Sequence, residues 1–367
     1  MSTIAAGFSQ PATSGYGPRG SVIAQAGLVR DKLDMLTRQS ASGQVAATYG
    51  GLGNGAAISL SLRPEITRIA AWQSNIDAVQ GRMEVAQASL EQIGAIASDF
   101  RARTADLNGL SATMVDSVAA AAREALRSVA GLLNARHGDR YVFAGQDGAN
   151  APVPQAESIL SSGFFTDISA AVAGLGGGAA AVIASTMTTA SSNTAGISPF
   201  SDALSQPAAS LEVLNDVVPV GDGVAVQVGI LASANDEAVS AGSSTTGSHI
   251  RDILRALATL GSLSGDQMAD PAFAEVVADT RTSLEGAISA LAVDAGVLGN
   301  RQAALAETRT RLGETATVLQ GQVANVEDVD MADVLSRLSL TQTQLQASYQ
   351  LLAGLQSLSL TKFLGAG

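Results

Sequence analysis

The chain of 367 residues is 46% hydrophobic and can bury a large core, with two or three domains as the expected number. Its net charge of −12, with no compensating run of Lys or Arg, argues against a nucleic acid partner. The absence of Cys excludes disulfides and thiolate metal sites. Aromatic residues make up only 4%, and small residues are frequent, so long packed helices are favoured over one thick core.

The N-terminal residues 1–20 lack the basic start and apolar run of a signal peptide. Polar residues interrupt every long apolar stretch of the chain, so we expect no membrane insertion. If the protein acts outside the cell, it needs an export route without a cleaved signal peptide.

An apolar stripe between residues 22 and 36 predicts the first helix. The stripe consists of Val22, Ile23, Leu28, Val29, Leu33 and Leu36. The Gly-rich run 50–56 that follows contains a Gly-x-Gly-x-x-Ala pattern. No apolar strand precedes it and no acidic residue ends a following strand, so we interpret it as a turn-rich linker rather than a dinucleotide-binding loop.

Two long stripes predict a rod of paired helices. The first has steps of three and four residues, with Thr104 the one polar position that breaks the apolar series. Pro64 suits the first turn of its helix. Its members are Ile69, Trp72, Ile76, Val79, Met83, Ala86, Leu90, Ile93, Ala97, Phe100 and Leu107. The second repeats every seven residues, at Leu284, Leu291, Leu298, Leu305, Leu312, Leu319 and Val326. Each stripe is roughly 60 Å long, so each is expected to bury itself against the other.

Between the two long stripes lie two shorter helices and a segment of different composition. One helix carries Met114, Val118, Ala122, Leu126, Val129 and Leu133, and the other carries Ile250, Ile253, Leu254, Leu257 and Leu260. Residues 150–247 are rich in Gly, Ala, Ser, Thr and Pro and show no helical stripe. Within them, 217–220 and 224–230 flank a Gly-Asp-Gly turn and predict a β-hairpin. We expect an inserted outer domain without which the rod still folds.

The last segment, 331–363, predicts a final helix that pairs with the first. Its stripe is Val334, Leu335, Leu338, Leu345, Tyr349, Leu352, Leu355 and Leu358. An acidic cluster precedes it, namely Glu327, Asp328, Asp330 and Asp333. This cluster lacks the central Gly and terminal Glu of a calcium loop, whereas acids in a first turn complement the helix dipole. We therefore interpret the cluster as helix initiation.

The predicted fold is mainly α: a long antiparallel, coiled-coil-like bundle formed by the N- and C-terminal regions, with an inserted α+β or β-rich domain. Residues 1–62 with 327–367 form the terminal helices, 63–148 with 249–326 the helical rod, and 149–248 the inserted domain.

Chemistry-bearing residues are scarce. The two histidines, His137 and His249, stand in polar sequence, and we interpret both as solvated. With only two histidines and no Cys, no Ser-His-Asp or Cys-His set is predicted, although a glycosidase-type carboxylate pair stays open. We predict no catalytic residue, no cofactor and no metal site. No basic region precedes the heptad leucines, so they indicate a core rather than a DNA-binding zipper.

Several stretches resemble the bacterial flagellin family. Residues 28–43 resemble the family's N-terminal helix ending in Ser-x-Gly, and 75–90 resemble the opening of its long helix. The acidic entry 326–333 is also similar. Tyr141, Phe143 and Gly145 resemble a Tyr-x-Phe-x-Gly signature of hook-associated protein 3, the hook–filament junction branch, whose Leu-Ser-Leu ending is similar to Leu358 to Leu360. The uncharged residues 44–54 depart from the family pattern.

The resemblance implies a non-enzymatic structural protein of the extracellular flagellum, exported by a type III apparatus without a cleaved signal. Its implied partners are other flagellar subunits (hook-associated proteins, flagellin and itself) and an export chaperone. The implied assembly interface on the terminal helices consists of Leu28, Leu33, Leu36, Leu338, Leu345, Tyr349, Leu352, Leu355, Leu358 and Leu360. The implied rod core consists of Trp72, Ile76, Val79, Met83, Leu90, Ile93, Leu284, Leu291, Leu298, Leu305, Leu312 and Leu319.

Three alternatives stay open. Filament flagellin shares the same nested plan. A soluble coiled-coil adaptor or signalling bundle accounts for the heptads but not for the signature at Tyr141 to Gly145. A carbohydrate-active or proteolytic insert between residues 150 and 247 is the third.

Overall fold

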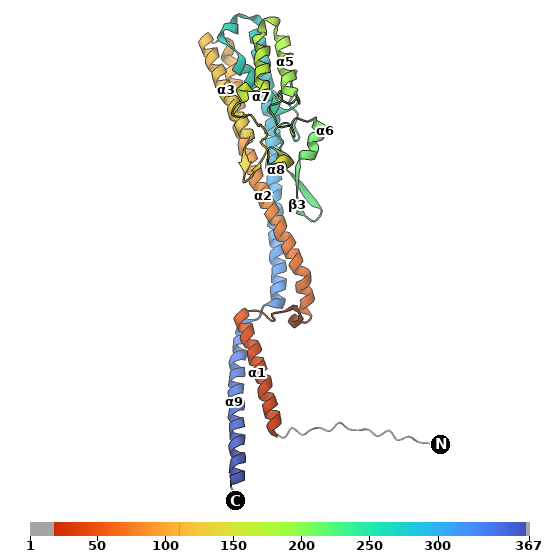
Figure 1. The fold of residues 1–367 in the computed structure, drawn as a ribbon, viewed down its shortest axis with the longest axis vertical. Coiled ribbons are helices and arrows are strands. Elements are labelled where there is room, and N and C mark those ends of the chain that lie inside the picture. Colours follow the sequence, from red (N-terminus) through yellow and green to blue (C-terminus); the bar gives the residue numbers. More distant parts are fainter. Residues whose placement is uncertain (1–17, 110, 365–367) are drawn as a thin grey trace, which may run out of the picture. The chain divides into compact units, whose positions relative to one another are not determined.

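A computed structural model describes residues 18–109 and 111–364, without the side chains of 18–22, 108, 208 and 355–364. The described residues are mainly helical, which confirms the predicted fold class (Figure 1). The helices are α1 (Pro18–Ser42), α2 (Gly55–Asp106), α3 (Ala112–Leu133), α4 (Gly163–Ala173), α5 (Ala179–Ser191), α6 (Ala208–Leu211), α7 (His249–Ser262), α8 (Pro271–Glu327) and α9 (Met331–Leu364). Two small antiparallel sheets pair β1 (Arg136–His137) with β2 (Arg140–Tyr141), and β3 (Asp216–Gly221) with β4 (Val224–Val228).

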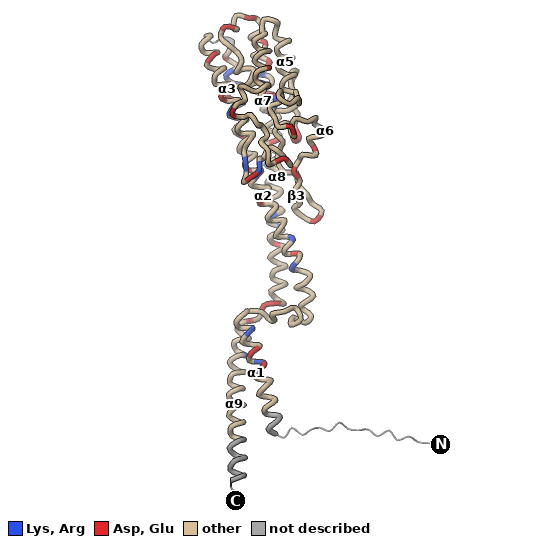
Figure 2. The backbone as a smooth tube through the Cα atoms, in the orientation of Figure 1, with Lys and Arg blue, Asp and Glu red and all other residues tan. Residues whose placement is uncertain are grey.

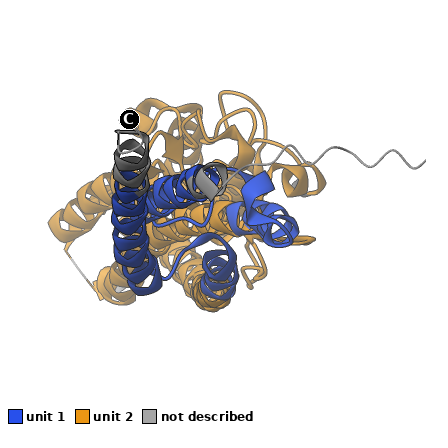
Figure 3. Cartoon of the chain, turned by 90° about the horizontal axis from the view of Figure 1, so that it is seen from below, with its two compact units in different colours: residues 1–68, 315–367 blue, residues 69–314 orange. Residues whose placement is uncertain are grey.

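The chain divides into two compact units (Figure 3). Unit 1 takes residues up to 68 and from 315, and therefore holds α1, α9, the start of α2 and the end of α8. Unit 2 takes residues 69–314 and holds all the shorter helices and both sheets. The three domain boundaries expected from the sequence stay a prediction.

Within unit 2, α2 and α8 run antiparallel. Asp77 pairs with Arg309 near one end, and Arg101 pairs with Glu285 at 3.7 Å further along. The buried residues of the α2 stripe are Ile69, Ile76, Val79, Met83, Ala86, Leu90, Ile93, Ala97, Phe100 and Leu107. Trp72 is half-buried. On α8, Leu284, Leu291, Leu298 and Leu305 are buried, whereas Leu312 and, in unit 1, Leu319 are half-buried.

Helix α2 begins earlier than the sequence suggested. Pro64 lies inside the helix rather than in its first turn. A proline removes the hydrogen bond to the carbonyl four residues before it, here that of Leu60. Because Leu60 is 54% exposed, water can satisfy this carbonyl, and the helix continues through the proline.

The inserted segment contributes helices as well as the predicted hairpin. The pairing of β3 with β4, with Val217 opposite Gln227 and Gly223 at φ +67° in the turn, confirms the hairpin. Helices α4 and α5 pack on each other and on α7, and α7 also packs on α3. Almost every residue of α7 is buried as a result. Residues 163–191 therefore form part of the core of unit 2. Because α7 needs this cover, we no longer expect the rod to fold without the insert.

Candidate functional site

Helices α1 and α9 lie side by side in unit 1 (Figure 1). Among their described side chains, those of Ala26, Leu36, Val334 and Thr341 are buried. The Thr341 hydroxyl donates to the Arg337 carbonyl at 2.7 Å, so the one buried hydroxyl in this group is satisfied. A helix pair that buries so few side chains is only marginally stable in water.

Large apolar side chains remain in water on both helices. They are Ile23, Leu28 and Met35 on α1, and Met331, Leu335, Leu340, Tyr349 and Leu351 on α9. Leu28 is 69% exposed and Leu351 is 65% exposed. Both line an open groove of about 410 Å³ between the helices, together with Val29 and Ala347. Clustered exposure of this kind is typical of a surface that another helix covers.

The predicted assembly residues occupy three environments. Leu36 is buried between α1 and α9. Leu33, Leu338, Leu345 and Leu352 are half-buried, and Leu28 and Tyr349 are exposed. Leu355, Leu358 and Leu360 lie outside the residues whose side chains the structure describes. The half-buried and exposed positions leave apolar surface for a neighbour, and their role in assembly stays a prediction.

Most of α9 carries no charge. The sequence contains no Asp, Glu, Lys or Arg from residue 338 to 361, and Figure 2 shows the described part of this stretch without acidic or basic positions. The hydroxyls of Thr343 and Ser348 donate back to carbonyls of their own helix, at 3.0 and 2.8 Å. Such a surface can be buried against other helices without the cost of desolvating a charge.

A junction inside unit 1 ties the ends of four helices together. Glu327, the last residue of α8, accepts hydrogen bonds from the Ser59 hydroxyl and from the Arg63 guanidinium, whose Nε lies at 2.9 Å. These hydrogen bonds lower the pKa of Glu327 to about 2, and the bond from Arg63 has the largest effect. The sequence interpretation of Glu327 as part of helix initiation is therefore wrong, whereas Asp330 does cap α9 by accepting from the backbone N–H groups of Ala332 and Asp333.

Backbone hydrogen bonds complete this junction. The N–H of Val45 donates to the Glu327 carbonyl at 2.7 Å, and that of Val329 donates to the Gly43 carbonyl at 2.9 Å. Gly43 directly follows α1 with φ +71°, a conformation that glycine adopts without strain. The Ser42-Gly43 ending of the first helix is thus the point where the chain turns to meet the end of α8.

The signature residues Tyr141, Phe143 and Gly145 lie in unit 2. Phe143 is 1% exposed, and its carbonyl accepts from the Ala232 N–H at 3.0 Å. Gly145 has φ +60°, and a Cβ there would lie 2.2 Å from the Leu214 carbonyl oxygen. The Arg136 guanidinium lies over the Tyr141 ring, with its carbon 4.9 Å from the ring centroid. The signature therefore joins the end of α3 to the inserted segment and accepts only glycine at position 145.

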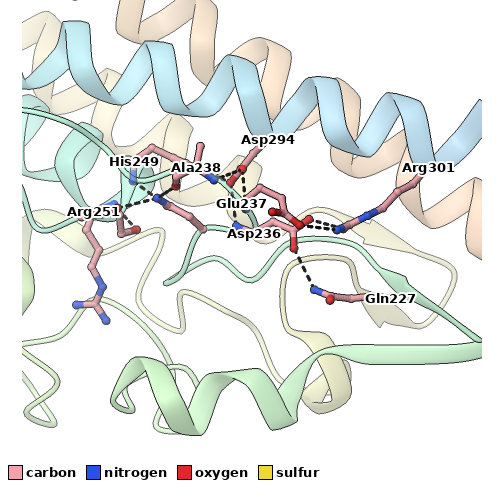
Figure 4. Close-up of polar contacts among 11 residues, drawn as sticks. Gln227, Asp236, Glu237, Ala238, His249, Arg251, Asp294 and Arg301 are labelled. Atoms are coloured by element: carbon pink, nitrogen blue, oxygen red, sulfur yellow. Dashed lines mark hydrogen bonds and ion pairs between the residues drawn. The ribbon is translucent and has the colours of Figure 1, made fainter.

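A buried carboxylate holds the inserted loop against α8 (Figure 4). Asp294 is fully buried and accepts from the backbone N–H groups of Asp236, Glu237 and Ala238, at 2.9, 3.0 and 2.9 Å. It also accepts from His249 Nε2 at 2.9 Å. Burial raises the pKa of Asp294, but the hydrogen bonds from His249 and the backbone outweigh it and keep the pKa below its ordinary value.

His249 is fully buried, so its interpretation as a solvated residue is wrong, whereas His137 is exposed. The insert covers α7 on the side that carries His249, which the sequence could not indicate. The His249 side chain contacts Asp294 through Nε2, and its Nδ1 has no hydrogen-bond partner among the described residues. Because neither side chain of the pair reaches solvent, a substrate has no access to it, and the pair acts as a structural clamp.

Two charged residues of α7, Asp252 and Arg255, likewise have partners inside unit 2. Asp252 accepts from the backbone N–H and the hydroxyl of Thr246, both at 2.8 Å. Arg255 donates to the Ser244 carbonyl at 2.6 Å and pairs with Asp279 at 3.4 Å. Within the residues that the structure describes, no cluster of three or more His, Asp or Glu could hold a metal ion, and no helix is long and apolar enough to cross a membrane.

Residues 282–364 match the family described as the bacterial flagellin C-terminal helical region. The match covers most of α8 and all of α9, including the uncharged stretch with its exposed apolar side chains. No curated protein matches the chain. The match covers less than half of the chain, and it shows that this part is similar to the C-terminal helices of bacterial flagellins.

Proposed function

We propose that this protein is a structural subunit of the bacterial flagellum that assembles at the hook–filament junction. The observation that carries the proposal is the apolar surface of α1 and α9, which lies partly within the matched flagellin region. Neighbouring subunits cover this surface with their own terminal helices. The contact is heterologous and does not close, so each added subunit offers a new surface and the tube grows.

The junction position rests on two resemblances. Tyr141, Phe143 and Gly145 match the Tyr-x-Phe-x-Gly signature, and Leu358 to Leu360 match the Leu-Ser-Leu ending. Filament flagellin is the second candidate because it shares the nested arrangement of terminal helices around a variable middle. The two candidates differ in the copy number of the protein in each flagellum.

Export through a flagellar type III apparatus, without a cleaved signal, is part of this proposal. Before assembly, the same apolar faces of α1 and α9 need temporary cover, because exposed patches of this kind promote aggregation. A dedicated export chaperone supplies that cover in this proposal.

The test is a deletion strain combined with quantification of the protein in purified flagella. A junction subunit is present in small amounts relative to flagellin, and its deletion leaves hooks without filaments. A protein that forms the bulk of the flagellar mass is filament flagellin instead. Recovery of the protein only from the cytosol, with normal flagella in the deletion strain, contradicts both and favours a soluble coiled-coil adaptor.

A further inference from the structure

Unit 2 contains an open cleft of about 730 Å³ that the proposed assembly does not use. One wall is a face of the β3–β4 hairpin, where Val217 and its cross-strand partner Gln227 line the cleft. Another wall is the end of α5 and the residues that follow it, including Asn193. A volume of several hundred Å³ is typical of a site for a small molecule.

Arg251 lines this cleft and is itself only 7% exposed. Figure 4 shows its side chain pointing away from the Asp294–His249 pair. Its N–H groups donate to the carbonyls of Ala190 and Ser233, at 3.0 and 3.1 Å, and to Asn193 Oδ1 at 2.8 Å. The guanidinium thus joins two walls of the cleft and is fixed in position before any ligand arrives.

Arg251 is a buried cation whose direct contacts are all neutral groups. Among the residues that the structure describes, no carboxylate pairs with it, and its contacts are carbonyls, an amide and the Phe200 ring at 5.0 Å. The carboxylate of the adjacent Asp252 is taken up by Thr246. Burial lowers the pKa of Arg251 to about 10 and outweighs the opposite effect of the neighbouring Asp252 carboxylate, so the protein compensates the buried positive charge only in part.

An unpartnered hydroxyl lies beside this cation. Ser233 lines the cleft and is 3% exposed, and its hydroxyl has no hydrogen-bond partner among the described residues. Its carbonyl is the one that Arg251 Nε contacts, so hydroxyl and guanidinium belong to the same corner of the cleft. Buried hydroxyls are normally hydrogen-bonded, and an unpartnered one at the base of a cleft indicates a missing acceptor or donor.

Acidic side chains on the other walls restrict the rest of the ligand. Glu212, Asp236 and Glu237 also line the cleft. Arg301 pairs with Asp236 and, at 3.5 Å, with Glu237. A second negative charge on a ligand is therefore unfavourable there, whereas amide side chains such as Gln227 can bind neutral hydroxyl groups.

We propose that this cleft binds a small monocarboxylate that carries several hydroxyl groups, a sugar acid by chemical class, with its carboxylate at Arg251 and Ser233. The carboxylate accepts from the Ser233 hydroxyl and neutralises the guanidinium, and the neutral body lies against the amide side chains of the walls.

The experiment is isothermal titration calorimetry of the full-length monomeric protein with glucuronate, and with glucose as the uncharged control of similar shape. Two serine variants form a matched pair. Ser233→Ala removes the unpartnered hydroxyl inside the cleft. Ser240→Ala removes a hydroxyl that is also buried and unpartnered but does not line the cleft. Both changes remove one small group, and thermal melting verifies that both variants fold.

The expected result is saturable binding of glucuronate and none of glucose, with affinity about fivefold weaker in Ser233→Ala, as for one lost hydrogen bond, and unchanged in Ser240→Ala. Three results overturn the proposal: no binding of glucuronate to the wild type, equal binding of glucose, or equal loss of affinity in the two serine variants. None of them bears on assembly through α1 and α9, so this test and that of the proposed function fail separately.

Discussion

The two units treat apolar and charged side chains in opposite ways. In unit 2, the charged groups of α7 are buried with partners, and the stripes of α2 and α8 are covered. In unit 1, α1 and α9 leave large leucines in water, and α9 carries no charged residue from 338 to 361. Unit 2 buries even the polar side chains of His249 and Asp294 completely, whereas unit 1 leaves the apolar side chain of Leu28 69% exposed. The core of unit 2 is therefore closed, and the apolar surface of unit 1 is of the kind that a neighbour covers.

The largest effect that this comparison predicts follows from truncation of α9. A chain that ends at residue 334 lacks most of the uncharged helix, and we expect no incorporation into the flagellum. The core of unit 2 draws no residue from α9, so the melting of unit 2 should change by less than about 1 kcal/mol. Incorporation is measured in a deletion strain, and melting by circular dichroism. Normal incorporation of the truncated chain would falsify the assembly role of α9.

The second prediction concerns the clamp at the centre of unit 2. Asp294→Ala leaves three backbone N–H groups and His249 Nε2 without their acceptor in a fully buried site. We expect the free energy of unfolding to fall by about 3 to 5 kcal/mol, the usual cost of breaking a buried polar network. Denaturant unfolding of the monomer measures the change.

A control for this variant is Asp167→Ala, which removes an exposed carboxylate of α4 in the same unit. Its effect should stay within about 0.5 kcal/mol. Similar effects of the two substitutions would show that the loop around Asp236 holds to α8 without the carboxylate.

The third prediction tests the seam of α8. Leu305 is 2% exposed, whereas Val293 on the same helix is 53% exposed. Leu305→Ala should cost about 2 to 3 kcal/mol, the lower part of the range for leucine, because the next stripe residue, Leu312, is only half-buried and the site can relax. Val293→Ala should be nearly neutral in the same denaturant experiment. If Leu305→Ala lowers the free energy of unfolding by less than about 0.5 kcal/mol, Leu305 does not belong to the packed face of α8.

The helical stripes were predictable because burial against one partner leaves a periodic pattern, as from Ile76 to Phe100. Helices α4 and α5 were not predictable by this means. Both are apolar or small on nearly every face, as in the sequence Ala179 to Ser191, so no stripe contrasts with a polar side. The start of α2 was missed because Pro64 is a strong boundary signal, and only the exposure of Leu60 explains why the helix continues.

The polar sites were less predictable than the helices. Asp294 binds three backbone N–H groups and a histidine 45 positions away in the sequence, and backbone donors leave no trace in residue identity. The charged face of α7, with Arg251 and Asp252, has the pattern of a solvated surface, and only the folded insert shows that it is covered. Glu327 seemed to belong to the acidic start of α9, whereas its partners Ser59 and Arg63 lie far away along the chain.

The smallest expected effect concerns the pH dependence of the junction in unit 1. The pKa of Glu327 falls from 4.5 to about 2 through the hydrogen bonds from Arg63 and Ser59. A carboxyl group with a lowered folded-state pKa contributes its stabilisation above the unfolded pKa and loses it as the pH falls towards the folded pKa. The contribution of Glu327 is therefore complete above pH 4.5 and decreases from there to about pH 2.

Glu327→Gln measures this contribution, because glutamine keeps the shape of the side chain and an acceptor oxygen but has no charge to titrate. The melting temperature of the wild type should exceed that of the variant by a constant amount above pH 4.5, and the difference should shrink steadily as the pH approaches 2. Because the Arg63 side chain is 51% exposed, solvent screens the pair and the difference should be small, and added salt should reduce it further. Glu65→Gln, in an exposed pair with Arg68 one helical turn away, is the control and should show a smaller difference at every pH. A gap between wild type and Glu327→Gln that widens as the pH falls would mean that the junction prefers the neutral acid, and the ionised carboxylate would then not be what ties α8 to Ser59 and Arg63 of α2.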